Sequence, residues 1–284
     1  MKVYVPQKCF NIVSINTAIE RYAPENFYFH GEMHDFWEMV YVLKGGITVS
    51  EDERVYDLAE GQVIFHRPME FHRLWGKKGK ESVLIIISFK TAGELPDVLG
   101  RGVFSLDLRL SEQLLDVYAQ ILSSFDVMSG IVTKSDKSNI IDENLSILKL
   151  ELLLLSIVSD ISPNKIQQNS VSSCNYKKII KTMKEHIYEN LSVDDLAVLC
   201  NLSTSNMKKI FKMYAGCGVN SHFNRLKILR AMELIREGYS VCEISEKFGF
   251  SSPNYFSLVF KRETGITPTQ YRRNPSISIM ANKN

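Results

Sequence analysis

Two sets of polar and basic side chains recur at the same helical spacing in the last third of the 284-residue chain. Members of each set stand three, four and seven positions after the first, which places them on one face of a helix. The sets are Ser205, Lys208, Lys209, Lys212 and Asn254, Ser257, Leu258, Lys261. One such stripe is usually a solvated surface. Two matched copies in a basic region indicate instead a repeated element that binds a polar, anionic partner.

The two stripes belong to an internal repeat with a shift of 48 to 49 residues. Each copy opens with a capping-box pattern, in which a serine precedes an acidic residue by three positions. The pairs are Ser192 with Asp195 and Ser240 with Glu243. Because a capping box marks the start of a helix, each copy is predicted to begin with a short helix.

A turn and a second capped helix follow in each copy. Asn201 and Gly249 stand at the turn, where both residue types tolerate a left-handed backbone. Ser203 and Ser252 are favourable N-caps, and Pro253 occupies the preferred first helical position. A short helix, a sharp turn and a second helix together predict two helix-turn-helix units.

Residues 176–273 resemble the DNA-binding domain of the AraC/XylS family of transcription regulators. The resemblance rests on ISEKFGF at 244–250, YFS at 255–257, VFK at 259–261 and GITPTQYR at 265–272. It implies seven helices, in which a central helix, here about residues 219–237, holds two recognition helices in successive major grooves. Those grooves lie one turn of DNA apart, about 34 Å.

The same resemblance implies which side chains contact DNA. Base-edge contacts are expected from Ser205, Lys208, Lys209, Asn254, Ser257 and Leu258. Lysine can donate to guanine and asparagine can pair with adenine. Family members often carry arginine where this chain has Leu258, so the second unit would read thymine methyl groups or mainly position the protein. Phosphate contacts are expected from Lys212, Arg225, Lys261 and Arg262.

The first part of the chain has a different pattern. Short β-branched or aromatic runs at 38–43, 47–49, 62–66 and 83–89 are separated by glycine-containing turns, which predicts a sandwich or small barrel. After residue 110 the pattern becomes helical, with Ser111 expected to cap one helix and residues 140–159 expected to form another.

This strand-rich part resembles the cupin-like sensor domain common in the same family. The matching residues are HDFWE at 34–38, YVLKG at 41–45, LAEGQ at 58–62, RP at 67–68 and His72. A small barrel can enclose one ligand, so the resemblance implies a pocket for a small-molecule effector. The pocket candidates are His34, Trp37, Glu38 and His72.

Three of those residues, His34, Glu38 and His72, fall where enzymatic cupins hold a metal. Histidine and carboxylate ligands would suit zinc, iron or manganese. The alternative is that the three side chains are polar wall residues without a metal. For a transcriptional cupin we favour the second interpretation, and we therefore expect neither metal nor cofactor.

The expected fold is an α+β multidomain protein, with a cupin-like β-barrel and accessory helices followed by an all-α domain. We predict a sensor domain at 1–105, a helical dimerisation or packing region at 106–161, a linker at 162–174, a DNA-binding domain at 175–274 and a disordered tail at 275–284. Charge divides in the same way. Residues from 175 onward hold 17 Lys and Arg against 9 Asp and Glu, whereas the preceding residues hold 17 against 23.

We therefore expect a sequence-specific transcription regulator, an activator by the commoner family role, and not an enzyme. Its expected partners are double-stranded promoter DNA, RNA polymerase, a small-molecule effector and a second copy of the chain that meets the leucine-rich helix. No run of about 18 apolar residues predicts a membrane span. Five cysteines without a CxxC pair favour a reducing compartment, the bacterial cytoplasm, with the protein at the nucleoid.

Three alternatives remain open at this point. A cupin enzyme with a helical appendage would leave the duplicated units unexplained. A DNA-repair methyltransferase would need an N-terminal cysteine cluster, whereas only Cys9 precedes Cys174. An architectural DNA-binding protein without a ligand would leave the acidic first part without a role.

Overall fold

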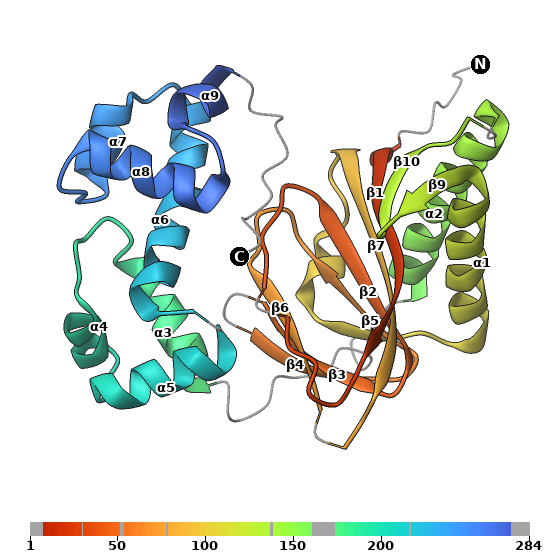
Figure 1. Ribbon diagram of the computed structural model, residues 1–284, viewed down its shortest axis with the longest axis horizontal. Helices are drawn as coiled ribbons and strands as arrows, with labels where there is room; N and C mark the ends of the chain where they lie inside the picture. The colour runs from red at the N-terminus through yellow and green to blue at the C-terminus, as the bar shows by residue number, and fades with distance from the viewer. Residues whose placement is uncertain are drawn as a thin grey trace, which may run out of the picture.

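The computed structural model describes residues 8–29, 31–51, 54–77, 79–136, 139–160, 174–215 and 217–273. A strand-rich N-terminal part lies beside a helical C-terminal part (Figure 1), which confirms the expected fold class. The predicted linker, apart from its last residue, and the predicted tail lie outside the described residues. Among the helices of the described segments, none is long and apolar enough to cross a membrane.

Two antiparallel sheets form the N-terminal barrel, and their strand orders are β8-β5-β2-β7-β1-β10-β9 and β4-β3-β6. Strand β7 is flanked by β1 and β2, which places these three at the centre of the larger sheet. The strands are β1 (Phe10–Ala23), β2 (Trp37–Lys44), β3 (Gly46–Glu51), β4 (Arg54–Ala59), β5 (Gln62–His66), β6 (His72–Gly76), β7 (Ser82–Gly93), β8 (Val103–Ser105), β9 (Phe125–Met128) and β10 (Ile131–Lys134), with a 3-10 turn η1 (Asp97–Arg101) before β8.

Alternation along each strand divides the barrel into two cores. Val40 and Val42 of β2 pack with residues of the smaller sheet inside the barrel. Met39 and Tyr41, on the other face of β2, pack with helices α1 (Leu108–Ser124) and α2 (Ile140–Asp160). The two helices therefore cover one side of the barrel, while the smaller sheet faces the helical domain (Figure 1).

The region after residue 105 differs from its prediction in two ways. Helix α1 begins at Leu108, because the Asp107 side chain caps it by accepting a hydrogen bond from the Leu110 amide at 2.7 Å, so the expected start at Ser111 was wrong. Residues 125–134, expected within a helical region, form the β9–β10 hairpin. Ser129 and Gly130 turn that hairpin with φ of 52° and 86°, a pair of left-handed residues typical of tight hairpins.

The C-terminal part contains seven helices within its described residues, as predicted. They are α3 (Cys174–Glu185), α4 (Val193–Leu199), α5 (Thr204–Tyr214), α6 (Val219–Arg236), α7 (Val241–Lys247), α8 (Pro253–Thr264) and α9 (Pro268–Arg273). One apolar core joins α3, α4 and α5 to the first half of α6, and a second joins the last half of α6 to α7, α8 and α9. The long helix α6 thus connects two units, as the central helix was expected to do.

Candidate functional site

The turns of both units have the conformation that the repeat predicted. Asn201 and Gly249 adopt φ of 53° and 67°, in the left-handed region. A Cβ atom at Gly249 would lie 3.2 Å from the Cβ of Asn190, so the turn also packs closely against the chain before the first unit. Both capping boxes are formed, between Ser192 and Asp195 and between Ser240 and Glu243. The repeat is therefore two helix-turn-helix units.

The second helix of each unit is capped and buried on one side. The Ser203 hydroxyl accepts from the Asn206 amide at 3.2 Å, and that of Ser252 accepts from the Tyr255 amide at 3.1 Å. The buried faces consist of Met207, Phe211 and Tyr214 on α5, and of Phe256, Val259 and Phe260 on α8. Burial of these faces leaves the opposite faces of α5 and α8 available to a partner.

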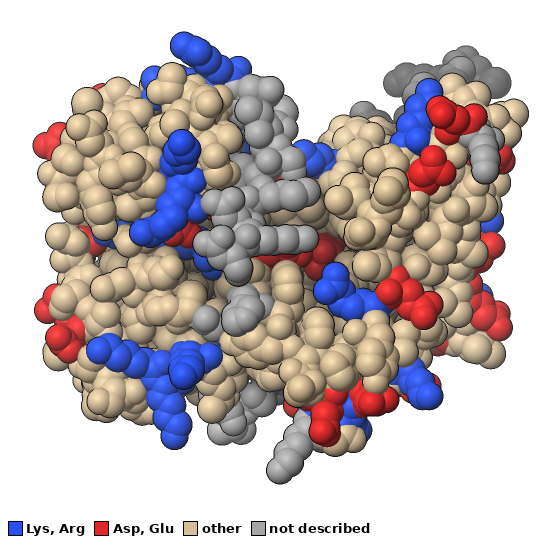
Figure 2. All heavy atoms as spheres, in the orientation of Figure 1, with Lys and Arg blue, Asp and Glu red and all other residues tan. Residues whose placement is uncertain are grey.

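The predicted base-reading residues lie on those open faces. Ser205, Lys208, Lys209 and Asn254 are exposed, as is Leu258 at 68%. Ser257 is half-buried, and its hydroxyl donates to the Pro253 carbonyl at 2.8 Å. Among the phosphate candidates, Lys212, Lys261 and Arg262 are exposed. Figure 2 shows basic side chains gathered over α5 and near α8, and acidic ones along the outer side of α1.

Arg225, the remaining phosphate candidate, is not exposed like the other three. Its side chain is only 16% exposed, and its Nε lies 3.3 Å from a carboxylate oxygen of Glu263. Its guanidinium carbon lies 4.3 Å from the centre of the Phe71 ring, which belongs to the barrel. Because an acidic partner and an aromatic face already hold this guanidinium, Arg225 differs from the open cations expected at a phosphate.

Lys227 of α6 bridges the two units, although no sequence motif indicated a role for it. Its Nζ donates to the carbonyls of Glu189 at 2.8 Å and Phe248 at 2.9 Å. The first carbonyl precedes the first unit, and the second lies at the turn of the second unit. Burial lowers the pKa of this ammonium group to about 8. Lys227 thereby fixes one unit relative to the other.

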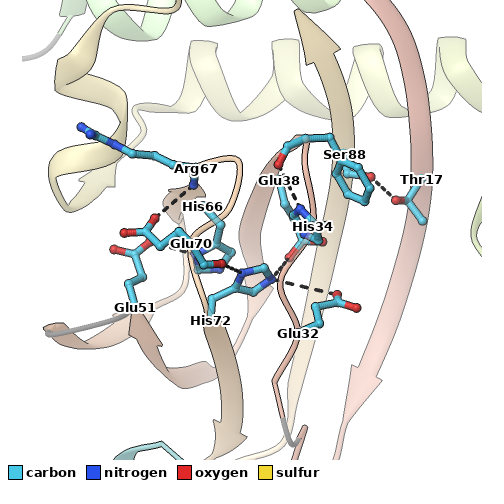
Figure 3. A network of polar contacts seen from close by, with 11 residues as sticks. Thr17, Glu32, His34, Glu38, Glu51, His66, Arg67, Glu70, His72 and Ser88 are labelled. Atoms are coloured by element: carbon cyan, nitrogen blue, oxygen red, sulfur yellow. Dashed lines mark hydrogen bonds and ion pairs between the residues drawn. The ribbon is translucent and has the colours of Figure 1, made fainter. Parts of the chain in front are cut away.

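Inside the barrel, three of the predicted pocket residues meet in a buried cluster (Figure 3). The Nε2 atoms of His34 and His72 lie 3.7 Å and 3.2 Å from the carboxylate of Glu38. Their Nδ1 atoms lie 2.9 Å from the Phe36 carbonyl and 3.1 Å from the Glu70 carbonyl. Since a carbonyl only accepts, Nδ1 carries the proton on both rings, and Nε2 faces the carboxylate.

His66, Glu51 and Glu32 extend the cluster, although the sequence analysis had not included them. The His66 ring stacks on that of His72 at 4.0 Å, and its Nδ1 lies 2.8 Å from Glu51 Oε1. Glu32 lies 4.0 Å from His72 Nε2. Strand register provides the missing signal, because Glu38 pairs with His66 across β2 and β5. Local sequence patterns do not specify that pairing.

Charge is distributed unevenly within the cluster. Desolvation raises the pKa of Glu38, but the adjacent His34 and His72 outweigh it and hold that pKa well below its usual range. Desolvation lowers the pKa of His72, yet the adjacent Glu38 raises it overall. Desolvation, with the nearby His72, keeps the pKa of His66 well below its usual range. Glu38 is thus the ionised centre of the site.

Trp37, the remaining pocket candidate, does not join this cluster. It packs against the core between the larger sheet and the helices α1 and α2. Trp37 and Glu38 are consecutive residues of β2, and consecutive side chains of a strand point to opposite faces.

The cluster also fits the coordination chemistry of a metal ion. Ligand atoms of Glu32, His34, Glu38 and His72 lie within 4.8 Å of one another. Imidazole nitrogens held by backbone carbonyls, together with carboxylate oxygens, are ligands that zinc, iron and manganese accept. The same donors could equally bind a polar organic molecule. The expectation of a site without metal stays a prediction.

Comparison with known proteins agrees with both halves of the fold. A cupin domain family matches residues 18–89, and a helix-turn-helix domain family matches residues 196–274. Both halves of the chain are thus similar to transcription regulators of the AraC family. The first segment contains the cluster around Glu38, and the second contains both helix-turn-helix units except the first residues of α4.

Two curated relatives match the chain over most of their length, and a third matches it over about half. It is 26% identical over 268 residues to the transcriptional activator RhaS of Escherichia coli O81, covering 91% of this chain and 92% of RhaS. It is 25% identical over 247 residues to the transcriptional activator RhaR of Mannheimia succiniciproducens, covering 84% of this chain and 85% of RhaR. It is 29% identical over 152 residues to the regulatory protein PocR of Salmonella typhimurium, but this match spans only 51% of the chain and 49% of PocR.

Proposed function

We propose that this AraC-family regulator is a sequence-specific transcription activator whose DNA binding or activation is controlled by a small molecule in its cupin domain. The observation that carries the proposal is the pair of capped helix-turn-helix units, whose second helices have buried inner faces and exposed outer faces. The relatives RhaS and RhaR are named as activators, not as enzymes, which supports activation.

Helix α5 would supply the hydrogen-bond donors of the DNA interface. Lys208 and Lys209 can donate to the guanine edge, and Ser205 can donate or accept. On α8, Asn254 can pair with adenine, whereas Leu258 can contact only an apolar surface such as a thymine methyl group. Ser257 already donates within its helix, and its oxygen can still accept. The second unit would therefore discriminate less by hydrogen bonds than the first.

Lys212, Lys261 and Arg262 would bind phosphates beside these base contacts. All three are exposed, and they occupy the later turns of α5 and α8, where a helix lying in the major groove approaches the backbone. Arg225 is left out of this set because Glu263 and Phe71 already contact its guanidinium.

The effector would bind at the cluster around Glu38. His34, Glu38 and His72 present two imidazole nitrogens and a carboxylate in an apolar barrel, a combination that selects a polar ligand by a few directed contacts. An activator would contact RNA polymerase at promoter DNA. The protein would therefore act in the bacterial cytoplasm.

A second copy of the chain would bind along helix α2. Five apolar side chains of α2 are 40–72% exposed and follow one another at alternating steps of four and three residues: Ile141, Leu145, Leu148, Leu152 and Leu155. That spacing is typical of a helix that packs along a partner helix. Dimerisation through α2 would present two DNA-binding domains to one promoter.

Salt-titrated binding to promoter fragments tests the proposed reading residues. Full-length protein, Lys208→Ala/Lys209→Ala and the charge-matched Lys178→Ala/Lys181→Ala variant are compared on a specific site and on unrelated DNA. We expect only the first variant to lose its preference for the site, by at least tenfold, since a good base contact contributes about 1–3 kcal/mol. Equal losses on both DNAs for both variants would show that the lysines bind phosphate only.

A further inference from the structure

Strands β3 and β6 separate the sensor cluster from the first helix-turn-helix unit. In their antiparallel register, Glu51 pairs with His72 and Ser50 pairs with Arg73. Because consecutive side chains of a strand point to opposite faces, the first pair and the second pair lie on opposite sides of this ladder. One side faces the barrel interior, and the other faces the helical domain.

The inner side is part of the cluster around Glu38. Glu51 contacts the His66 ring at 2.8 Å, and His72 lies 3.2 Å from Glu38 while stacking on His66. All four side chains are more than nine-tenths buried. A ligand that contacts Glu38 or displaces His72 therefore acts directly on the β3–β6 ladder.

On the outer side of the ladder, Arg73 and Ser50 bind the C-terminal end of the first recognition helix, α5. Arg73 Nη1 donates to the Met213 carbonyl at 3.0 Å, and Ser50 Oγ donates to the Tyr214 carbonyl at 2.9 Å. These carbonyls belong to the last turn of α5, where no further helical amide follows to satisfy them. A guanidinium at this end is also favoured by the helix dipole.

Arg73 is held in place by the barrel. The side chain is fully buried, and its guanidinium carbon lies 4.6 Å from the centre of the Tyr28 ring and 4.7 Å from that of Trp75. Trp75 in turn packs into the apolar core of the first unit, with Val55 of β4. A rigid, desolvated clamp of this kind transmits a displacement of β6 to α5 better than a solvated contact would.

We propose that Arg73 and Ser50 couple the sensor cluster to the first recognition helix. A change at Glu38 and His72 alters the β6 backbone, and the two hydrogen bonds on its other face transfer that change to the last turn of α5. Arg73 acts as a positioning residue, since it contacts neither effector nor DNA. The proposal rests on the proposed function in one respect, namely that the cluster is the sensor and α5 is a reading helix.

Hydrogen–deuterium exchange of the full-length protein, without DNA, tests this coupling. Glu38→Gln perturbs the cluster, Arg73→Met removes the guanidinium while keeping an unbranched stem, and the double variant combines them. Glu151→Gln is the matched control, because Glu151 is also a buried carboxylate of this domain but contacts Lys8 and the Ile12 amide instead.

We expect Arg73→Met to speed amide exchange in the last turn of α5 by about tenfold to a hundredfold, because the substitution removes one hydrogen bond to a charged group. Glu38→Gln should change exchange of the same amides severalfold, and Glu151→Gln should not. In the Arg73→Met background, Glu38→Gln should have a clearly smaller effect on α5, because only the Ser50 contact then remains.

An unchanged α5 in Glu38→Gln, or an equal effect of that substitution with and without Arg73, would overturn the coupling. If Arg73→Met disturbs exchange throughout the barrel, Ser50→Ala replaces it, because that change removes only one hydroxyl. The exchange experiment is carried out without DNA, so it tests the coupling separately from DNA binding. If the coupling is observed but the protein shows no sequence-specific DNA binding, only the proposed function is contradicted.

Discussion

His222 of α6 is a neutral histidine buried between the two domains. It is fully buried, its ring nitrogens have no hydrogen-bond partner among the described residues, and its ring meets Phe71 and Phe211 edge-on. Desolvation, with the nearby Arg225 and Lys184, lowers its pKa from 6.5 to about 3. Between those two values the unfolded chain binds a proton that the folded chain excludes, so folding stability falls as the pH falls through this window.

The free energy of unfolding should therefore lose roughly 1.4 kcal/mol per pH unit from this residue below pH 6.5. His222→Leu removes the proton site and suits the apolar surroundings, so this contribution to the slope should vanish. Urea unfolding at pH 7 and pH 5.5 measures it for both proteins. Identical pH slopes would show that folding does not lower the pKa of His222.

At the scale of single elements, helix α5 places a capping serine and a proposed base-reading serine two residues apart. Ser203 caps the helix, while Ser205 lies two residues later on its exposed face. Ser203→Ala should lower the free energy of unfolding by about 1 kcal/mol. Ser205→Ala should change it by less than about 0.5 kcal/mol but weaken specific DNA binding. Urea unfolding and DNA titration of both variants check the pair, and equal stability losses would contradict the assignment.

Helix α2 provides a prediction about assembly. Leu148→Glu/Leu152→Glu places two charges in the exposed stripe, where each leucine is 57% exposed and leaves no cavity in its own subunit. We expect this variant to sediment as a folded monomer while the unchanged protein sediments as a dimer. Val198→Glu, at a 74% exposed site on α4, is the control and should stay dimeric. A dimer that survives the double substitution would place the interface elsewhere.

Elements defined by local signals were predictable from the sequence, whereas those defined by distant partners were not. Capping boxes and left-handed turns act within a few residues, so both helix-turn-helix units followed from the repeat. Strand β1 was missed because it is specified by pairing with β7, about seventy residues away. The positions of His66 and Glu51 in the cluster depend on strand register, which local sequence patterns do not give. Trp37 lies outside the cluster because consecutive side chains of β2 point to opposite faces.

At the scale of the whole molecule, a few contacts fix the barrel and the two helix-turn-helix units relative to one another. Lys227 bridges the carbonyls of Glu189 and Phe248 and so sets the orientation of one unit relative to the other. Arg73 and Ser50 hold the end of α5 against the barrel. Two recognition helices with a fixed relation should accept DNA sites of only one spacing.

Selection of genomic fragments by the purified full-length protein, followed by salt-titrated binding to the selected sites, tests that central claim most directly. The structure predicts sites with two short boxes whose centres lie about 10–10.5 base pairs apart, with binding lost in Lys208→Ala/Lys209→Ala. Weak binding that depends steeply on salt, without preference for sequence or spacing and unaffected by those lysines, would contradict it.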